Sequence, residues 1–155
     1  MVTTITSNTF IADSVLYIRD YLVTSVTDPI LSTRSNTSRF IMTSYPRRAT
    51  EYPIITVRDS GGSLIQRGGM RSTVTINKIQ IEIRVWGRNV IERDQLSQEI
   101  LDDLRTVQTT ANTGSEVVGL HDFNVASVVN VPPPQEGEEN IQSKIIRIEY
   151  MVILT

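Results

Sequence analysis

The sequence predicts an α+β fold, with a mostly antiparallel sheet of about five strands and two helices packed on one face. Residues 79–85 alternate between apolar and polar side chains, which is typical of a strand with one buried and one solvent-facing side. Residues 96–107 then show apolar side chains at helical spacing, and residues 143–154 alternate again. These patterns indicate a half-buried sheet with helices on its dry face. The expected order is helix, three strands, helix and two strands.

The first expected element is a helix of about four turns. Polar residues at positions 7–9 offer an N-cap, and Asp28 ends the helix because the residue before a proline is pushed out of the helical region. The apolar stripe that would face the sheet comprises Ile11, Val15, Ile18, Leu22 and Val26.

Two short strands are expected next, over residues 39–44 and 54–57, with prolines between them. Residues 58–72 then contain two pairs of adjacent glycines. Because glycine adopts positive φ at little cost, and because this stretch is too long for a tight turn, we expect a flexible arm or a projecting hairpin here.

The central alternating strand ends at Trp86, and the second helix is expected to begin directly after it. Asn89 is the expected N-cap, and Glu92 three residues later is its partner in a capping box. The apolar stripe of this helix comprises Leu96, Ile100, Leu104 and Val107.

The last two strands are expected over residues 124–131 and 143–154, separated by a proline-rich acidic loop at residues 132–142. Alternation in the first of these strands would place on one side Val125, Ser127, Val129 and Val131. The length suits a single domain that spans residues 1–155.

Composition excludes several classes of protein. The chain has 155 residues, no cysteine, one histidine and a formal net charge of −2. It therefore offers no disulfide framework, no cysteine zinc site and no strongly basic surface for nucleic acid. The first residues lack the regions of a signal peptide, and no apolar run approaches the ~20 residues that span a bilayer. We expect a soluble protein made in the cytoplasm, without membrane contact.

No motif in the chain carries catalytic chemistry. His121 beside Asp122 lacks a nucleophile motif, and the glycine spacing of residues 114–119 lacks the lysine of a phosphate loop. Asp102 and Asp103 are adjacent on a helix, so their side chains diverge by about 100°. The loop arginines have no interleaved aromatic residues, which a nucleic-acid stacking platform requires. The sequence therefore predicts no enzyme activity, no cofactor and no metal site.

Three consecutive features of the chain form a family pattern. Residues 52–57 are a proline-led strand, and residues 81–87 are a central alternating strand that ends in an aromatic and a small residue. The helix that follows has a leucine and isoleucine pattern made of Leu96, Ile100, Leu101 and Leu104. This pattern resembles the tail terminator and tail-completion (head–tail joining) proteins of long-tailed bacteriophages, and by element order the resemblance covers roughly residues 10–155.

The resemblance implies a structural virion protein of the tail or neck, assembled in the host cytoplasm. Proteins of this family form a ring, expected here to be a hexamer, that terminates the tail tube and joins it to the head connector. The implied partners are other copies of the chain, the tail tube protein and a head-completion or connector protein. DNA would only pass through the channel.

Two features supply candidate contacts for such an assembly. Residues 150–154 form an unbroken apolar end to the last strand, which would be an aggregation liability if it were exposed in a monomer. The glycine-rich arm carries apolar residues that a partner would bury on docking. The candidate partner-binding residues are Leu64, Ile65, Arg67, Met70, Trp86, Tyr150, Val152 and Ile153.

The acidic loop supplies a candidate channel lining. Cationic side chains in a DNA passage would gain affinity through counterion release and would slow the DNA, whereas acidic side chains avoid this. The candidate channel-facing residues are Glu136, Glu138 and Glu139. The alternative for this loop is a solvated outer position without a role.

Two alternatives to a tail terminator stay open at this point. One is another neck or head-closure adaptor ring of a tailed phage, which only the partner protein would distinguish. The other is a small α+β ligand-binding domain or enzyme. That class requires a pocket with convergent polar groups, and the sequence alone indicates none.

Overall fold

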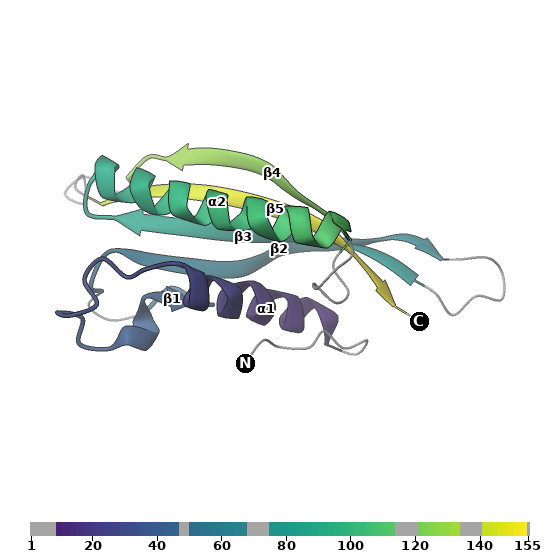
Figure 1. Cartoon of the computed structure of the whole chain (residues 1–155), viewed down its shortest axis with the longest axis horizontal. Coiled ribbons are helices and arrows are strands. Elements are labelled where there is room, and N and C mark those ends of the chain that lie inside the picture. The colour runs from purple at the N-terminus through teal and green to yellow at the C-terminus, as the bar shows by residue number, and fades with distance from the viewer. Residues whose placement is uncertain (1–8, 47–49, 68–74, 114–120, 134–140, 155) are drawn as a thin grey trace.

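The computed structural model describes residues 9–46, 50–67, 75–113, 121–133 and 141–154. Two helices lie on one face of a five-stranded sheet (Figure 1), so the predicted α+β class is confirmed, and the order of elements is the predicted one. The strands lie in the order β1-β2-β3-β5-β4, and only β1 and β2 are parallel. The elements are α1 (Phe10–Ser25), the 3₁₀ helix η1 (Thr37–Arg39), β1 (Ile41–Met42), β2 (Ile54–Arg67), β3 (Thr75–Gly87), α2 (Val90–Thr113), β4 (His121–Val131) and β5 (Gln142–Leu154).

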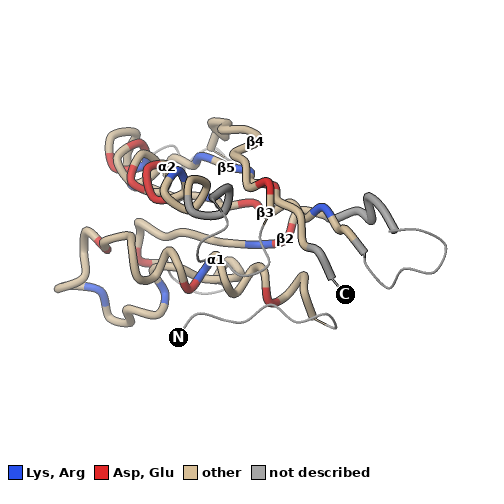
Figure 2. The backbone as a smooth tube through the Cα atoms, turned by 45° about the vertical axis from the view of Figure 1, so that its right-hand side comes forward, with Lys and Arg blue, Asp and Glu red and all other residues tan. Residues whose placement is uncertain are grey.

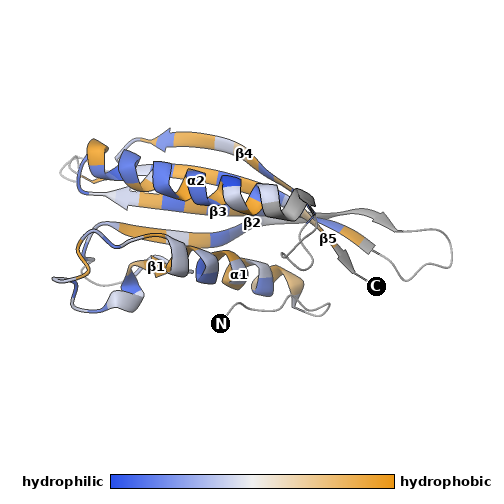
Figure 3. Cartoon of the chain, viewed as in Figure 1, coloured by the Kyte–Doolittle hydropathy of each residue, from blue (hydrophilic) through white to orange (hydrophobic). Residues whose placement is uncertain are grey.

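Strand β3 is the centre of the sheet, and hydrophobic and hydrophilic residues alternate along it (Figure 3). It pairs along its whole length with β5, and Ile81 lies opposite Ile148 while Ile83 lies opposite Ile146. Partners in an antiparallel pair point to the same face, so these side chains form one apolar row beneath the helices. The β3 residues with no exposed surface are Ile79, Ile81, Ile83 and Val85.

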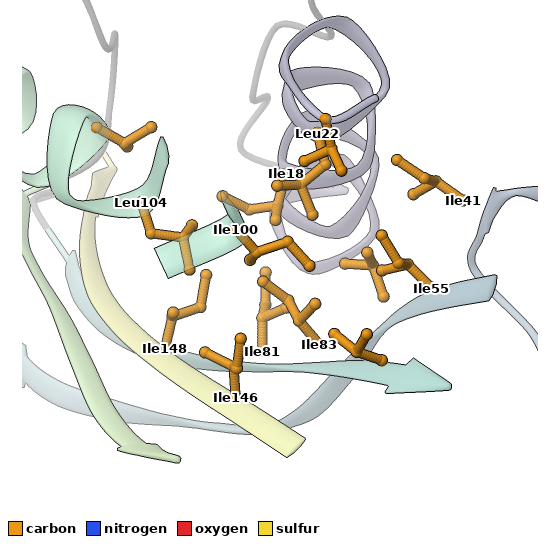
Figure 4. Packing of buried hydrophobic residues seen from close by; sticks show 14 of the residues in the cluster. Ile18, Leu22, Ile41, Ile55, Ile81, Ile83, Ile100, Leu104, Ile146 and Ile148 are labelled. Carbon is orange, nitrogen blue, oxygen red and sulfur yellow. The ribbon is translucent and has the colours of Figure 1, made fainter. Parts of the chain in front are cut away.

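The core lies between the sheet and the two helices. Helix α1 packs against β1 and β2, and α2 lies over β3, β5 and β4. Ile18 and Leu22 of α1 and Ile100 and Leu104 of α2 are fully buried and meet the isoleucines of the sheet (Figure 4). Burial of each such side chain contributes about 1.5–3 kcal/mol to stability. Ile11, the first residue of the predicted α1 stripe, is 41% exposed instead.

A buried arginine holds the loop after α1 in place. The side chain of Arg34 is fully buried and forms an ion pair with Asp28, whose side chain is 5% exposed. Arg34 Nη1 donates a hydrogen bond to the carbonyl oxygen of Glu51, and Nη2 donates one to the carbonyl oxygen of Pro53, each at 2.6 Å. The guanidinium carbon lies 5.2 Å from the centre of the Phe40 ring. One side chain therefore ties the loop, the start of β1 and the start of β2 together.

Strand β2 is longer than the predicted residues 54–57. It continues through residues 58–67, the first part of the expected arm, and pairs there with β3 as an antiparallel hairpin. Gly61 has a φ of +133° next to a register shift after Asp59, and a residue with a side chain would be strained in that conformation. Residues 68–74, the rest of the expected arm, lie outside the described residues.

The face assignment predicted for β4 is wrong beyond Val125. Val125 lies opposite Ile148 and packs against the core, but a register shift follows and places Ser127 opposite Arg147. The bulge therefore turns Ser127 and Val129 to the face away from the helices. Alternation alone does not reveal such a shift, because one extra residue reverses every later position.

Helix α2 begins at the predicted N-cap. The side-chain oxygen of Asn89 accepts a hydrogen bond from the Glu92 backbone N–H at 2.8 Å. The Glu92 carboxylate in turn accepts a hydrogen bond from the backbone N–H of Arg88 at 2.8 Å, one residue before the cap. The turn from β3 into α2 is tight, because a Cβ atom on Gly87 would lie only 2.8 Å from the backbone nitrogen of Arg93.

Tyr150 and Val152, two residues of the apolar end of β5, are part of the core, which corrects the sequence-based prediction that they are exposed. Tyr150 and Val152 are each 1% exposed. Tyr150 stacks on Phe123 of β4 with ring centres 6.0 Å apart, and its burial raises the pKa of the hydroxyl group. The side chains of Tyr150 and Val152 are therefore unavailable to a partner, and they no longer give a reason to expect subunit contacts along β5.

Acidic residues gather on α2 (Figure 2), and one of them ties the helix to the sheet. Asp94 Oδ1 accepts a hydrogen bond from Arg93 Nε at 2.8 Å and lies 2.7 Å from Nζ of Lys144 on β5. The hydrogen bonds from Arg93 and Lys144 lower the pKa of Asp94 to about 2.

Because the pKa of Asp94 is lower in the folded than in the unfolded chain, Asp94 stabilises the fold above pH 4 and loses this effect as the pH falls toward 2. We expect Asp94→Asn to reduce the free energy of unfolding at pH 7 by less than about 1 kcal/mol, since the side chain is 44% exposed and screened by solvent. Denaturant unfolding at pH 7 and pH 2 should show a larger difference between the two proteins at pH 7 than at pH 2. An equal difference at both pH values would contradict this.

Candidate binding site on the open face of the sheet

The second face of the sheet points away from both helices, and no second layer of helix or strand covers it within the described residues. Polar and aromatic side chains occupy its centre. From β2, β3 and β5 this face presents Thr56, Arg58, Glu82, Arg84, Trp86, Ser143 and Arg147. The polar positions of the alternating strand, which the sequence left without a role, therefore come together on one surface.

Arg84 lies over the ring of Trp86 at the middle of this surface. Its guanidinium carbon lies 3.8 Å from the centre of the Trp86 ring. Arg84 also donates hydrogen bonds to Ser143 Oγ, at 3.0 Å from Nη2 and 3.3 Å from Nε. Burial lowers the pKa of the Arg84 guanidinium, and Glu82 opposes this shift. No carboxylate within the described residues forms an ion pair with Arg84.

Aromatic side chains close one side of the same surface. The rings of Tyr45 and Trp86 are 5.0 Å apart between centres and tilted by 55°. The hydroxyl groups of Tyr45 and Tyr52 lie 2.5 Å apart. The Trp86 Nε1 atom is buried and has no hydrogen-bond acceptor in the described part of the chain. These residues border a pocket of about 410 Å³ lined by Thr43, Ser44, Tyr45, Tyr52, Thr56, Arg58, Arg84, Trp86 and Ile141. We call it the arginine–tryptophan pocket.

Glu82 is buried at the floor of this face, where two arginines compensate its charge. Arg58 donates two hydrogen bonds to Glu82 Oε1, at 2.9 Å from Nε and 2.6 Å from Nη2. Arg147 Nη2 lies 3.8 Å from Glu82 Oε2. With Arg84, this cluster holds three guanidinium groups and one carboxylate, a local charge of +2 on a chain whose formal net charge is −2.

Of the predicted partner-binding residues, only Trp86 has its side chain described at this site. Leu64, Ile65 and Arg67 lie in the far part of β2, and Ile153 lies in β5, but their side chains are outside the described part of the structure. The predictions for Met70, Glu136, Glu138 and Glu139 fall on residues that the structure does not describe.

Sequence reasoning missed the residues that surround Trp86. It set Arg58 aside with the other loop arginines for lack of interleaved aromatics and gave Arg84 no role, yet both line one pocket with Tyr45 and Tyr52. Interleaving along the chain was the wrong criterion, because neighbouring strands bring distant residues together. The available signal was the arginine two residues before Trp86 on one strand, since positions i and i+2 share a face.

The residues for which the sequence predicted no catalytic role can be placed on the structure as well. His121 is exposed at the start of β4, and the adjacent Asp122 has a φ of +51°. Within the described residues, no group of three or more histidine, aspartate or glutamate side chains is placed to hold a metal ion. No helix of that part of the chain is long and apolar enough to cross a membrane.

Comparison with known proteins does not assign a family to this chain. A scan against protein-family models gave no match, and a search of curated proteins gave none. The proposals that follow therefore depend on the geometry of the strands and pockets and on the resemblance seen in the sequence.

Proposed function

We propose that this chain is a structural subunit of a ring that terminates the tail tube of a tailed bacteriophage and joins it to the head connector. The outer edge of β4, which no other strand covers within the described residues, carries the proposal. This strand pairs with β5 on one side, and no described strand pairs with its other side. It contains no lysine, arginine or proline, the residues that commonly protect an edge in monomers. Val128 and Val129 on it are 44% and 45% exposed.

The opposite end of the sheet offers a different edge. Strand β1 pairs with β2 only at Ile55 and Thr56, so beyond them β2 has no described strand partner on that side. Beside this edge lies an apolar groove of about 600 Å³ lined by Thr9, Phe10, Ile11, Ala12, Val15, Leu16, Thr43 and Asp59. Two unlike edges at opposite ends of one sheet favour head-to-tail contacts, which close into a ring when the rotation between subunits permits it.

The family resemblance supports placing this ring in a phage neck. The resembling segments fall on β2, β3 and α2, and the β2–β3 hairpin extends past the ends of both helices (Figure 1). This projecting hairpin is the element that we assign to contact with the tail tube or connector protein. DNA would pass through the ring, and the role is structural, without a catalysed reaction.

The absence of cysteine from the chain makes cross-linking a direct test of the ring. A chain that carries both Ser60→Cys on β2 and Val129→Cys on β4 should react with a short bismaleimide in the assembled particle. We expect a ladder of covalent oligomers that ends at the hexamer, because each subunit then has one thiol at each end of its sheet. Either substitution alone should give no product larger than a dimer.

Two further measurements separate the ring from its place in the virion. Mass measurement in solution, combined with negative-stain imaging, gives the assembly state of the purified protein, and antibody labelling of intact particles gives its location. Labelling at the junction of head and tail supports the proposal. Particles that contain the chain but give no ladder from the double variant would contradict the ring, and labelling away from the junction would contradict the neck assignment.

A further inference from the structure

The arginine–tryptophan pocket has the convergent polar groups that a ligand site requires, and the proposed ring does not use it. Arg84 has five N–H donors, and its bonds to Ser143 engage only the Nε and Nη2 atoms. The Trp86 ring and the hydrogen bonds to Ser143 hold the guanidinium group in place. A planar guanidinium held in this way is arranged to bind a carboxylate through two parallel hydrogen bonds.

The net positive charge of the pocket also favours the binding of an anion. Arg58 and Arg147 offset the single buried carboxylate of Glu82, so Arg84 adds a positive charge without an ionic partner in the described residues. Partial burial of a guanidinium group without a counter-ion costs free energy, because the group loses hydrogen bonds to water. A bound carboxylate would replace those hydrogen bonds. The Nε1 hydrogen of Trp86 is a further donor without an acceptor in the described part of the chain.

We propose that the arginine–tryptophan pocket binds an acidic peptide segment of a partner protein, with a glutamate or aspartate carboxylate on Arg84. Nucleic acid fits the pocket less well. Arg84 already lies over the Trp86 ring and Tyr45 packs against it, so the Trp86 ring is not free for a base to stack on. This inference does not depend on the proposed ring.

Trp86 is the only tryptophan in the chain, so its fluorescence reports on the pocket directly. We would titrate the full chain at low salt with a short blocked peptide in which glutamate and glycine alternate, and with a second peptide that has glutamine in place of glutamate. The acidic peptide should change the Trp86 fluorescence in a saturable way, and the neutral peptide should not. Added salt should weaken the binding.

Variants at Arg84 test the contact itself. Arg84→Gln should weaken binding of the acidic peptide by about ten- to a hundredfold, the usual loss for hydrogen bonds to a charged group. Arg84→Lys keeps the charge but loses the planar pair of donors, so we expect a loss of about tenfold. Arg105→Gln on α2 removes the same charge from a side chain that is 67% exposed, and its affinity should stay within about twofold of the unchanged chain.

Several outcomes would overturn the proposal. These are the absence of a saturable signal, equal binding of both peptides, equal binding by Arg84→Gln and Arg105→Gln, and tighter Arg84-dependent binding of a single-stranded oligonucleotide. A combined variant with Glu136→Gln, Glu138→Gln and Glu139→Gln tests whether the chain fills its own pocket. Peptide binding that appears only in this variant would assign the pocket to the acidic loop of the chain itself. Thermal unfolding of every variant confirms that it is folded.

Discussion

Replacing Arg34 by alanine should lower the free energy of unfolding by about 3–5 kcal/mol, the largest loss that we expect from one substitution in this chain. The change leaves the carboxylate of Asp28, which is 5% exposed, without its cation in a poorly solvated place. It also removes the donors for the carbonyl oxygens of Glu51 and Pro53. Chemical denaturation measured by circular dichroism gives the free energy.

An exposed ion pair provides the control for Arg34. Arg105 pairs with Asp102 on α2, but their side chains are 67% and 58% exposed, so Arg105→Ala should change stability by less than about 1 kcal/mol. Arg34→Lys should recover little of the loss, because one ammonium group does not reproduce the separate bonds that the guanidinium makes. A loss below about 1 kcal/mol for Arg34→Ala would show that the loop rearranges to expose Asp28.

Replacing Ile81 by alanine should lower the free energy of unfolding by about 2–5 kcal/mol. Ile81 lies on the central strand, has no exposed surface and faces Ile148 beneath the helices (Figure 4). Sheet and helices surround it, so the cavity cannot collapse without moving several elements, and we expect a loss in the upper part of that range. Urea unfolding with an unchanged dependence on denaturant concentration would confirm that the loss is one of native-state packing.

The same chemical change at an exposed position isolates the packing contribution. Ile91 in the first turn of α2 is 69% exposed, so Ile91→Ala removes the same atoms without opening a cavity. Alanine is also the better helix former. We expect a change within about 0.5 kcal/mol of zero. Similar losses at Ile81 and Ile91 would show that intrinsic propensity, and not the cavity, determines the effect.

The sequence predicts those parts of the fold that local patterns determine, such as the alternation of hydropathy in a strand or the cap of a helix. Ile81 and its neighbours alternate because one face of β3 is dry, and Asn89 caps α2 because a short polar side chain reaches the free N–H groups. In contrast, the bulge after Val125 depends on how β4 meets β5, and no pattern within β4 shows it. The exposure of Tyr150 was predicted wrongly for a similar reason, because the ring of Phe123 from another strand packs against it.

The candidate site was harder to predict than the fold. Trp86 was selected from the sequence, but the pocket forms only when Tyr45 from a loop, Arg58 from β2 and Arg84 from β3 converge. Their pairing follows from register and from the path of the loop, which single residues do not encode. Arg34 shows the same limit in a structural role, since a polar loop gave no sign of a buried guanidinium group.

The position of β5 determines when the sheet can form during protein synthesis. This strand lies between β3 and β4, although it comes after both of them in the sequence. Until β5 has left the ribosome, β4 has no described strand to pair with. The β3 isoleucines that lie opposite Ile146 and Ile148 are also without their neighbours from β5 until then. Such non-local pairing is slow, and uncovered strands aggregate in the meantime. Translation that stops before residue 142 therefore yields an aggregation-prone fragment and not a smaller folded domain.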